Sequence, residues 1–478
     1  MKQQNILFVP CSIVMAFLVL TLWSQSTSWL YYRPFTCDSA IFQVIGKYWA
    51  NGEALPYRDL WDLKGPVIFL VNALGYMLTD SKTGVFLIQI LFLSTTIFIA
   101  FIGLKSYFNL MFSAFFAGLI PLSLTSMIND GNTVSEYSLP LLFLSFILFE
   151  KFLQKNFITH PWKYAFVYGL SFGWCLMSRL TDFIPMVGVI ISLLIFIIIH
   201  KQWRNLMCNV IAFVTGAFMI ILPFVLYFGL KGQEYEFWYG TVLYSIGYAK
   251  NSFTGIESWL SLFVFLKDYL PLILMLVLAI AMVSYKPARF RGFFWLASTL
   301  ISLLWFLRSR LSPAYAIVTL PYIYVFVIEL KSICSQSGKT KLCKRVFIIA
   351  VLFLLLGFSK EVYNLRRNLR EYNPSFWSDK ELIDIIPKND LNSFVAYDWS
   401  PQNYLYENIR PCYRYFILQD FEAGMNNSLR KRVIDCFSSL RAKWILVSNY
   451  DKSLIRPILD SNYTVIAEKN GKKLMKRN

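Results

Sequence analysis

Long apolar runs separated by short polar segments dominate the first three quarters of this chain. Eleven of them approach the ~20 residues that an α-helix needs to cross a bilayer. Backbone groups inside lipid must hydrogen-bond to one another, so these runs predict helices and not open strands. The composition, 56% hydrophobic and 15% charged, excludes an ordinary soluble enzyme. The predicted spans are 6–23, 84–103, 110–127, 137–153, 164–178, 183–199, 207–230, 270–284, 293–307, 314–330 and 346–358.

The net charge of +18 is distributed unevenly around these spans. If the N-terminus is cytoplasmic, the inner segments hold fifteen Lys or Arg residues and two acidic residues. The outer loops then hold eleven Lys or Arg residues and twelve acidic residues. Positively charged loops mark the cytoplasmic side of a membrane protein. The sequence therefore predicts a cytoplasmic N-terminus and an extracytoplasmic C-terminal segment. The positive charge is explained by topology, so no nucleic-acid partner is expected.

A change in composition divides the chain near residue 358. Residues 1–358 form the predicted transmembrane domain, in which the outer loop 24–83 is long, polar and acidic. Within it, the apolar run 66–78 is too short to span and predicts a re-entrant or interfacial segment. Residues 359–478 predict a small α/β domain, because short strand and helix patterns alternate there. The expected strands are 393–397, 413–418, 444–448, 463–468 and 473–476, with helices at 401–408, 427–441 and 452–460 and a hairpin turn at Asn470-Gly471.

Histidine and cysteine positions restrict the chemistry of the outer face. Both histidines, His160 and His200, fall on the predicted cytoplasmic side, so a Ser-His hydrolase and a His-bound zinc site are not expected outside. Cys412 and Cys436 both face outward, and either a disulfide between them or two free thiols is compatible with the sequence.

Charged residues gather at the outer ends of the predicted helices. Because charge beside a membrane span is costly, each raises a functional question. Structural explanations also exist. Arg179 and Asp182 are three residues apart and can pair with each other. Arg308 and Arg310 can reach lipid headgroups, and Asp59 can cap a turn. Glu53 is expected to be solvated. The cluster comprises Asp38, Asp59, Asp62, Lys64, Asp130, Glu136, Arg179, Asp182, Arg308 and Arg310.

This set of side chains suits group transfer from a phosphate-activated lipid. A lipid phosphate leaves without needing a proton, but positive charge must stabilise it. An acceptor hydroxyl needs a base, and without outward histidines that base must be a carboxylate. Asp38 directly follows the first helix, where a purely structural role would suit Ser or Asn equally well, so it is the candidate base.

Three motifs resemble bacterial membrane glycosyltransferases of the protein-mannosyltransferase-like (GT-C) superfamily, which includes aminoarabinose transferase. The first is Asp38-Ser-Ala-Ile-Phe followed by the stretch Asn51 to Pro66, with Pro-Tyr-Arg-Asp-Leu-Trp-Asp-Leu-Lys-Gly-Pro at its end. The second is Arg310-Leu-Ser-Pro-Ala-Tyr315, in which Ala314 replaces the family's histidine. The third is Asn132 to Glu136. Pro411-Cys-Tyr-Arg414-Tyr is a weaker match.

The resemblance implies a GT-C-like α-helical polytopic membrane protein. The implied reaction is inverting transfer of a sugar from a polyprenyl-phosphate donor to a lipid, glycan or protein acceptor, at the outer face of a bacterial inner membrane. No cofactor is required by this resemblance, although a divalent cation is compatible with it. A polytopic transporter or lipid flippase without transferase activity is the alternative.

The resemblance also suggests roles for individual residues. Asp38, Asp62 and Glu136 are the candidate catalytic carboxylates, and Asp38 and Glu136 are the candidates to hold any cation. Lys64, Arg310, Arg179, Arg308 and Tyr315 are the candidates to bind the donor phosphate.

Overall fold

The computed structural model describes residues 2–31, 37–128, 130–155, 159–251, 259–309, 312–338, 340–370, 374–398 and 401–478. The chain forms two compact units. Unit 1 comprises residues 1–24, 89–224 and 253–369, and unit 2 comprises 25–88, 225–252 and 370–478. These two units differ from the division that the composition change near residue 358 suggests. Helix α17 (Thr340–Arg370) runs through residue 358, and residues 25–88 belong to unit 2 together with residues 370–478.

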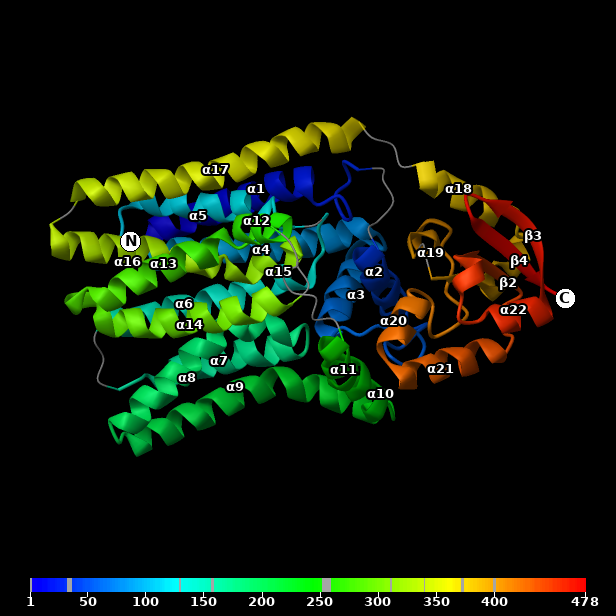
Figure 1. The fold of residues 1–478 in the computed structure, drawn as a ribbon, viewed down its shortest axis with the longest axis horizontal. Coiled ribbons are helices and arrows are strands. Elements are labelled where there is room, and N and C mark those ends of the chain that lie inside the picture. Colours follow the sequence, from blue (N-terminus) through cyan, green and yellow to red (C-terminus); the bar gives the residue numbers. More distant parts are fainter. Residues whose placement is uncertain are drawn as a thin grey trace. The chain divides into compact units, whose positions relative to one another are not determined.

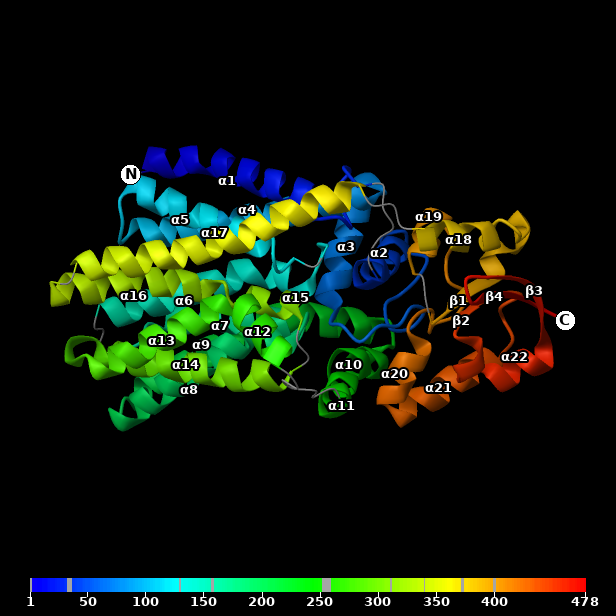
Figure 2. The ribbon, with the colours of Figure 1, turned by 45° about the horizontal axis from the view of Figure 1, so that its top comes forward.

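Unit 1 is a bundle of long apolar helices (Figure 1). Within it α13 packs on α14 and α16, α14 packs on α8, and α6 packs on α7. Figure 2 shows these helices running alongside one another. The helices that lie wholly or mainly in unit 1 are α1 (Lys2–Trp23), α4 (Lys82–Lys105), α5 (Leu110–Leu124), α6 (Leu139–Gln154), α7 (Trp162–Leu176), α8 (Ile184–Ile199), α9 (Trp203–Leu230), α12 (Trp259–Asp268), α13 (Leu270–Ser284), α14 (Arg289–Arg308), α15 (Pro313–Ala316), α16 (Pro321–Ser337) and α17.

Among the described residues, fewer helices are long and apolar enough to cross a membrane than the eleven spans that the sequence predicts. In the described part of the chain, four helical segments are long and apolar enough to cross a membrane: 82–105, 180–199, 203–230 and 286–308. A fifth candidate is the bent pair 313–319 and 321–337. Shorter apolar helices occupy 7–23, 66–79, 110–124 and 270–284. The helical membrane architecture is confirmed, but the count of eleven is not.

The two acids of the predicted inner segments are both buried in unit 1. Glu329 on α16 accepts two hydrogen bonds of 3.0 Å from Nε of Arg291 on α14. Glu150 on α6 accepts hydrogen bonds from Gln154 at 2.6 Å and from the Trp295 indole at 3.2 Å. Buried charges persist when they are paired and hydrogen-bonded, so these contacts fasten three helices together.

Unit 2 contains two helices that pack against each other, α2 (Cys37–Ala50) and α3 (Pro66–Thr79). Gly46 allows their close approach, because a Cβ there would lie 2.5 Å from Cβ of Asn72. The predicted interfacial segment 66–78 is thus a regular helix, begun by Pro66 at its first position, where its missing N–H costs nothing. Unit 2 also contains α10 (Glu234–Trp238), the π-helical turn η3 (Tyr239–Leu243) and α11 (Tyr244–Asn251).

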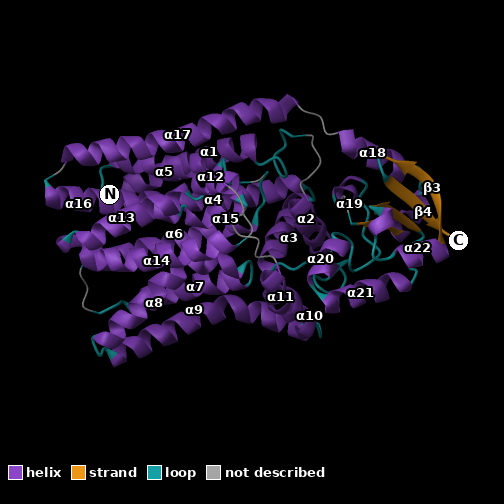
Figure 3. Cartoon of the chain, viewed as in Figure 1, coloured by secondary structure: helices purple, strands orange, loops and turns teal. Residues whose placement is uncertain are grey.

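The C-terminal part of unit 2 contains a four-stranded sheet (orange in Figure 3) with strand order β1-β2-β4-β3. Strands β1 (Phe394–Tyr397) and β2 (Trp444–Ser448) are parallel, and β4 (Lys472–Arg477) is antiparallel to both β2 and β3 (Tyr463–Lys469). Asn470 and Gly471 both have positive φ, as expected for the hairpin turn. The surrounding helices are α18 (Pro374–Ile383), α19 (Gln402–Tyr406), α20 (Gln419–Met425), α21 (Asn427–Ser438) and α22 (Arg456–Asn462).

One expectation for this region is corrected. Residues 413–418 do not form a strand. Their aromatic side chains are buried, and carbonyl groups that a strand would pair accept hydrogen bonds from side chains instead: the Tyr415 carbonyl from Gln419 and the Phe416 carbonyl from Tyr404. Of the two alternatives that the sequence left open for Cys412 and Cys436, the structure has the two free thiols.

Candidate active site

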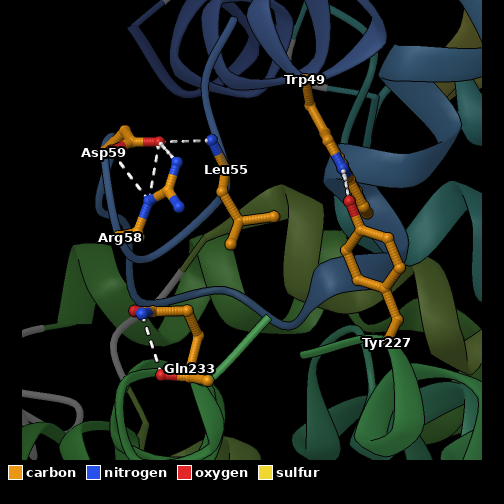
Figure 4. A network of polar contacts seen from close by, with 7 residues as sticks. Trp49, Leu55, Arg58, Asp59, Tyr227 and Gln233 are labelled. Carbon is orange, nitrogen blue, oxygen red and sulfur yellow. Dashed lines mark hydrogen bonds and ion pairs between the residues drawn. The ribbon is translucent and has the colours of Figure 1, made fainter. Parts of the chain in front are cut away.

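The loop between α2 and α3 is stiffened at its start by Asp59. The Oδ2 atom of Asp59 accepts a hydrogen bond of 2.8 Å from the Leu55 backbone N–H, and Arg58 binds the same carboxylate at 2.7 Å (Figure 4). The turn-capping role expected of Asp59 is thus confirmed. Figure 4 also shows the Trp49 indole donating to the Tyr227 hydroxyl at 2.8 Å, which ties α2 to the start of the second chain segment of unit 2. Glu53 is exposed, as expected.

Tyr57 is the buried centre of this loop. Its φ of +67° is unusual for a residue with a side chain, and its ring is fully buried between Phe69, Phe228 and Phe237. Its hydroxyl donates to the Lys64 carbonyl at 2.7 Å and accepts from Thr241 at 3.2 Å. Gly240 makes room for the ring, because a Cβ there would lie 2.5 Å from it. Tyr57 therefore fixes the backbone that carries Lys64.

The second half of the loop is held by the C-terminal segment and by α11. The backbone N–H of Trp61 donates a hydrogen bond to the Arg414 carbonyl at 3.0 Å. The Trp61 indole packs edge-on against Tyr244 and Tyr415. The Ser245 hydroxyl donates to the Leu63 carbonyl at 3.3 Å. The weakly matched element around Arg414 thus has a definite structural role, which is to hold the loop that carries Asp62 and Lys64.

Four carboxyl groups and one lysine interact within unit 2. Asp62 and Glu422 are each 4% exposed, whereas Asp38 is exposed in the first turn of α2. Burial raises the pKa of Asp62, which Lys64 opposes and Asp38 reinforces. Burial and then Asp62 raise the pKa of Glu422 well above its usual value, with Asp38 and Asp398 also contributing. These groups form what we call the acid cluster: Asp38, Asp62, Asp398, Glu422 and Lys64.

One buried side-chain oxygen of this cluster has no hydrogen-bond partner. Among the described residues, Oδ2 of Asp62 is buried and has no hydrogen-bond partner. An orphaned buried carboxylate oxygen is expensive, at about 1–3 kcal/mol, and such atoms deserve a functional explanation. A bound substrate group that donates a hydrogen bond would satisfy it.

Glu136 lies in unit 1 and is engaged in local structure. Its carboxylate accepts hydrogen bonds from the Thr133 N–H at 2.7 Å, the Thr133 hydroxyl at 2.9 Å and the Gln89 amide at 2.8 Å. With Thr133 it forms a capping box that starts the 3₁₀ turn before α6. Burial raises the pKa of Glu136 to about 7, against these hydrogen bonds. Thr133 and Gln89 therefore account for both oxygen atoms of this carboxylate.

The predicted pairing of Arg179 with Asp182 is confirmed. The Arg179 Nε lies 2.7 Å from the Asp182 carboxylate, its Nη2 donates to Ser135, and its guanidinium stacks on Tyr315 at 4.3 Å. Two phosphate-site candidates, Arg179 and Tyr315, are thus in contact within unit 1. Arg308 is exposed at the end of α14, and Arg310 lies outside the described residues.

No cofactor is assigned to either group of residues. Within the described segments, no cluster of three or more His, Cys, Asp or Glu side chains is arranged to hold a metal ion. Asp38 and Glu136, the two candidates for a cation, belong to different compact units.

Sequence reasoning missed two members of the acid cluster, Asp398 and Glu422. Asp398 follows β1 with a φ of +65°, and Glu422 lies on α20, a seven-residue helix that no periodicity predicts. The positive φ of Asp398 has no sequence signal, and α20 is too short to show an apolar stripe. The acidic stretch Gln419-Asp-Phe-Glu was the one available hint.

Comparisons with known proteins agree with this architecture. Residues 63–228 match the family described as dolichyl-phosphate-mannose-protein mannosyltransferase. A crystal structure of ArnT from Cupriavidus metallidurans bound to undecaprenyl phosphate is similar with a TM-score of 0.58 and 14% identity, covering 98% of this chain and 97% of that chain, and its apo state gives the same values. A crystal structure of the Archaeoglobus fulgidus oligosaccharyltransferase complexed with Zn and sulfate has a TM-score of 0.50 and 11% identity, covering 98% and 73%. The search of curated proteins found no match.

At these identities the solved structures establish the fold, and the family match covers residues 63–228. The chain has the helical GT-C membrane glycosyltransferase fold with a small C-terminal sheet domain, and the aminoarabinose-transferase-like resemblance predicted from its sequence is confirmed.

Proposed function

We propose that this protein transfers a sugar, with inversion, from a polyprenyl-phosphate donor to a hydroxyl group of a lipid, glycan or protein acceptor. The observation that carries the proposal is the acid cluster, in which Asp38 and the partly buried Lys64 accompany an Asp62 with an orphaned oxygen. The similar ArnT structure contains undecaprenyl phosphate, which supports a donor of this kind.

The reaction is a single displacement. Asp38 removes the proton from the acceptor hydroxyl as its oxygen attacks the anomeric carbon of the sugar. The bond between that carbon and the phosphate oxygen breaks, and its electron pair leaves with the polyprenyl phosphate. Attack and departure occur on opposite faces of the sugar, so the configuration inverts.

Lys64 stabilises the departing phosphate. Its backbone is fixed by the Tyr57 hydroxyl at 2.7 Å, so the side chain extends from a fixed position in the loop. Phosphate charge grows as the sugar leaves, so a fixed cation lowers the barrier more than it strengthens ground-state binding. Arg310 is the second cation proposed for this role, with Arg179, Arg308 and Tyr315 as further candidates. Asp62 lies beside Lys64 and orients the reacting groups.

The site is proposed to act at the outer face of a bacterial inner membrane, as the positive-inside charge distribution indicates. Catalysis there needs no protein histidine on that face. A cation requirement is left to experiment, with Asp38 and Glu136 as the sequence-derived candidates.

The test is sugar transfer by purified protein in vesicles, using a panel of polyprenyl-phosphate sugars and outer-membrane or cell-surface acceptors. Asp38→Asn should reduce turnover by ~10²–10⁴, because an amide cannot accept the hydroxyl proton. Glu53→Gln is the matched control, since it neutralises an exposed acid in the same loop region. Equal turnover of Asp38→Asn and the wild type would remove Asp38 from the mechanism.

A further inference from the structure

Helix α20 holds an acidic side chain deep inside unit 2. Glu422 is 4% exposed. Its own carbonyl accepts a hydrogen bond of 3.0 Å from the Tyr244 hydroxyl, and its N–H donates to the Leu418 carbonyl at 2.9 Å. At the start of the helix, the Gln419 amide donates to the carbonyls of Ala396 and Tyr415 at 3.3 and 3.0 Å. These contacts fix the backbone of the helix at Glu422.

The surroundings of Glu422 are the acid cluster. The charged groups that act on it are Asp62 and Lys64 from the loop before α3, Asp38 from α2, and Asp398 from the end of β1. The pKa of the Cys37 thiol of α2 is raised by burial and also by nearby carboxyl groups, of which Glu422 is one. Carboxyl groups outnumber lysine four to one here. A negatively charged Glu422 would repel both its neighbours and a phosphate-bearing donor.

The same cluster contains the orphaned Oδ2 atom of Asp62. That atom is buried and unpartnered among the described residues, so the cluster has a hydrogen-bonding position that the protein itself leaves unfilled. A hydroxyl-rich ligand fits such a position, because a hydroxyl can donate to Asp62 and accept from a neighbouring carboxylic acid.

We propose that Glu422, from the C-terminal segment, is a positioning residue of the transferase site that hydrogen-bonds a hydroxyl group of an uncharged substrate sugar or acceptor. This inference rests on the proposed function and extends it, since it makes the C-terminal segment part of the substrate site. The carboxyl group acts as a neutral acid, donating one hydrogen bond and accepting another. Burial favours that form, as does the negative charge around it.

Two replacements of nearly equal size separate this role from packing. Glutamine is neutral, has the same length and can both donate and accept, whereas methionine fills similar space without a hydrogen bond. Glu422→Gln should keep turnover and both KM values within about threefold. Glu422→Met should raise the KM of one substrate by about 3–10-fold, which is the range expected for losing one neutral hydrogen bond.

The two substrates are titrated separately in the vesicle transfer assay. A rise in KM for the polyprenyl-phosphate sugar alone assigns the contact to the donor sugar, and a rise for the acceptor alone assigns it to the acceptor hydroxyl. Glu468→Met is the matched control, because Glu468 lies on β3 with a side chain that is 55% exposed. Thermal unfolding of each variant in detergent reports whether packing has changed.

Several outcomes would overturn the inference. One is a Glu422→Met protein with wild-type turnover and KM values. Another is a Glu422→Gln protein as impaired as Glu422→Met, which would mean that a negative charge is needed. A third is a parallel loss of activity and thermal stability in Glu422→Met. A wild-type protein that transfers no sugar would instead overturn the proposed function, and this inference would fall with it.

Discussion

Replacing Asp62 with Asn should separate activity from stability. Asp62 is buried with an unpartnered Oδ2 atom. Burial raises the pKa of its carboxyl group; Lys64 opposes this increase and Asp38 adds to it. The folded protein therefore disfavours the ionised form. Asparagine has the same shape without the charge, so Asp62→Asn should be at least as stable as the wild type while losing activity.

The size of the effect follows from the buried charge, because asparagine leaves a polar atom at the same position and so keeps the cost of about 1–3 kcal/mol for an unsatisfied buried polar group. For a domain of 150–250 residues, 1 kcal/mol shifts Tm by roughly 2–4 °C. The Tm of Asp62→Asn at neutral pH should therefore equal that of the wild type or exceed it by a few degrees. Transfer activity should fall by ~10²-fold, the penalty typical of a misplaced reacting group.

The pH dependence has a definite sign. A carboxyl group whose folded pKa is raised binds its proton more tightly in the folded state. Its contribution to stability is full below the unfolded pKa of about 4 and is lost as the pH rises toward the folded pKa. The Tm of the wild type should therefore fall relative to that of Asp62→Asn as the pH rises from about 4 toward neutrality.

Asp59 in the same loop supplies a control of opposite sign. Burial alone would raise the pKa of Asp59, but hydrogen bonds from Arg58 and from the Leu55 N–H outweigh it and lower the pKa. The stability that Asp59 contributes is thus present above the unfolded pKa and lost as the pH falls through the folded value. Asp59→Asn should lower Tm slightly at neutral pH and leave the chemistry intact.

The assay is thermal unfolding in detergent between pH 4 and 8, followed by tryptophan fluorescence, with transfer measured on the same preparations. The reasoning is refuted if Asp62→Asn loses Tm at every pH in step with activity. That result would mean that Asp62 has a structural role and that its buried oxygen finds a hydrogen-bond partner in solution.

Three further outcomes are expected. Lys64→Gln should lower turnover at saturating polyprenyl-phosphate donor, and an effect on donor affinity alone would contradict transition-state stabilisation by Lys64. Gly240→Ala should lower Tm, at a cost of about 1–3 kcal/mol, because its Cβ would meet the Tyr57 ring at 2.5 Å; an unchanged Tm would show that the ring can move. Single cysteines at 341 and 427 should label from opposite sides of the membrane, and labelling of both from one side would overturn the topology.

Local sequence signals predicted local structure well. Arg179 and Asp182 are three residues apart and pair at 2.7 Å, and the Asn470-Gly471 turn joins β3 to β4. The cap formed by Asp59 spans only four residues. In each case the partners are close in sequence, so residue type and spacing suffice.

Signals that depend on distant partners failed. The run 413–418 has the aromatic and β-branched composition of a strand, yet tertiary burial of its aromatic rings overrides that propensity. Glu422 lies 360 residues beyond Asp62, on a helix of seven residues. Neither spacing nor periodicity can join two such positions, since only the fold of unit 2 brings them together.

Within the acid cluster, burial separates the carboxyl groups by role. Asp38 is exposed in the first turn of α2. Asp62 and Glu422 are buried among other acids, where the protonated form is favoured. A base must be ionised before it can take a proton, whereas a group that positions a hydroxyl can be neutral. The burial that distinguishes Glu422 from Asp38 therefore makes Glu422 a poor base and a good hydrogen-bond donor.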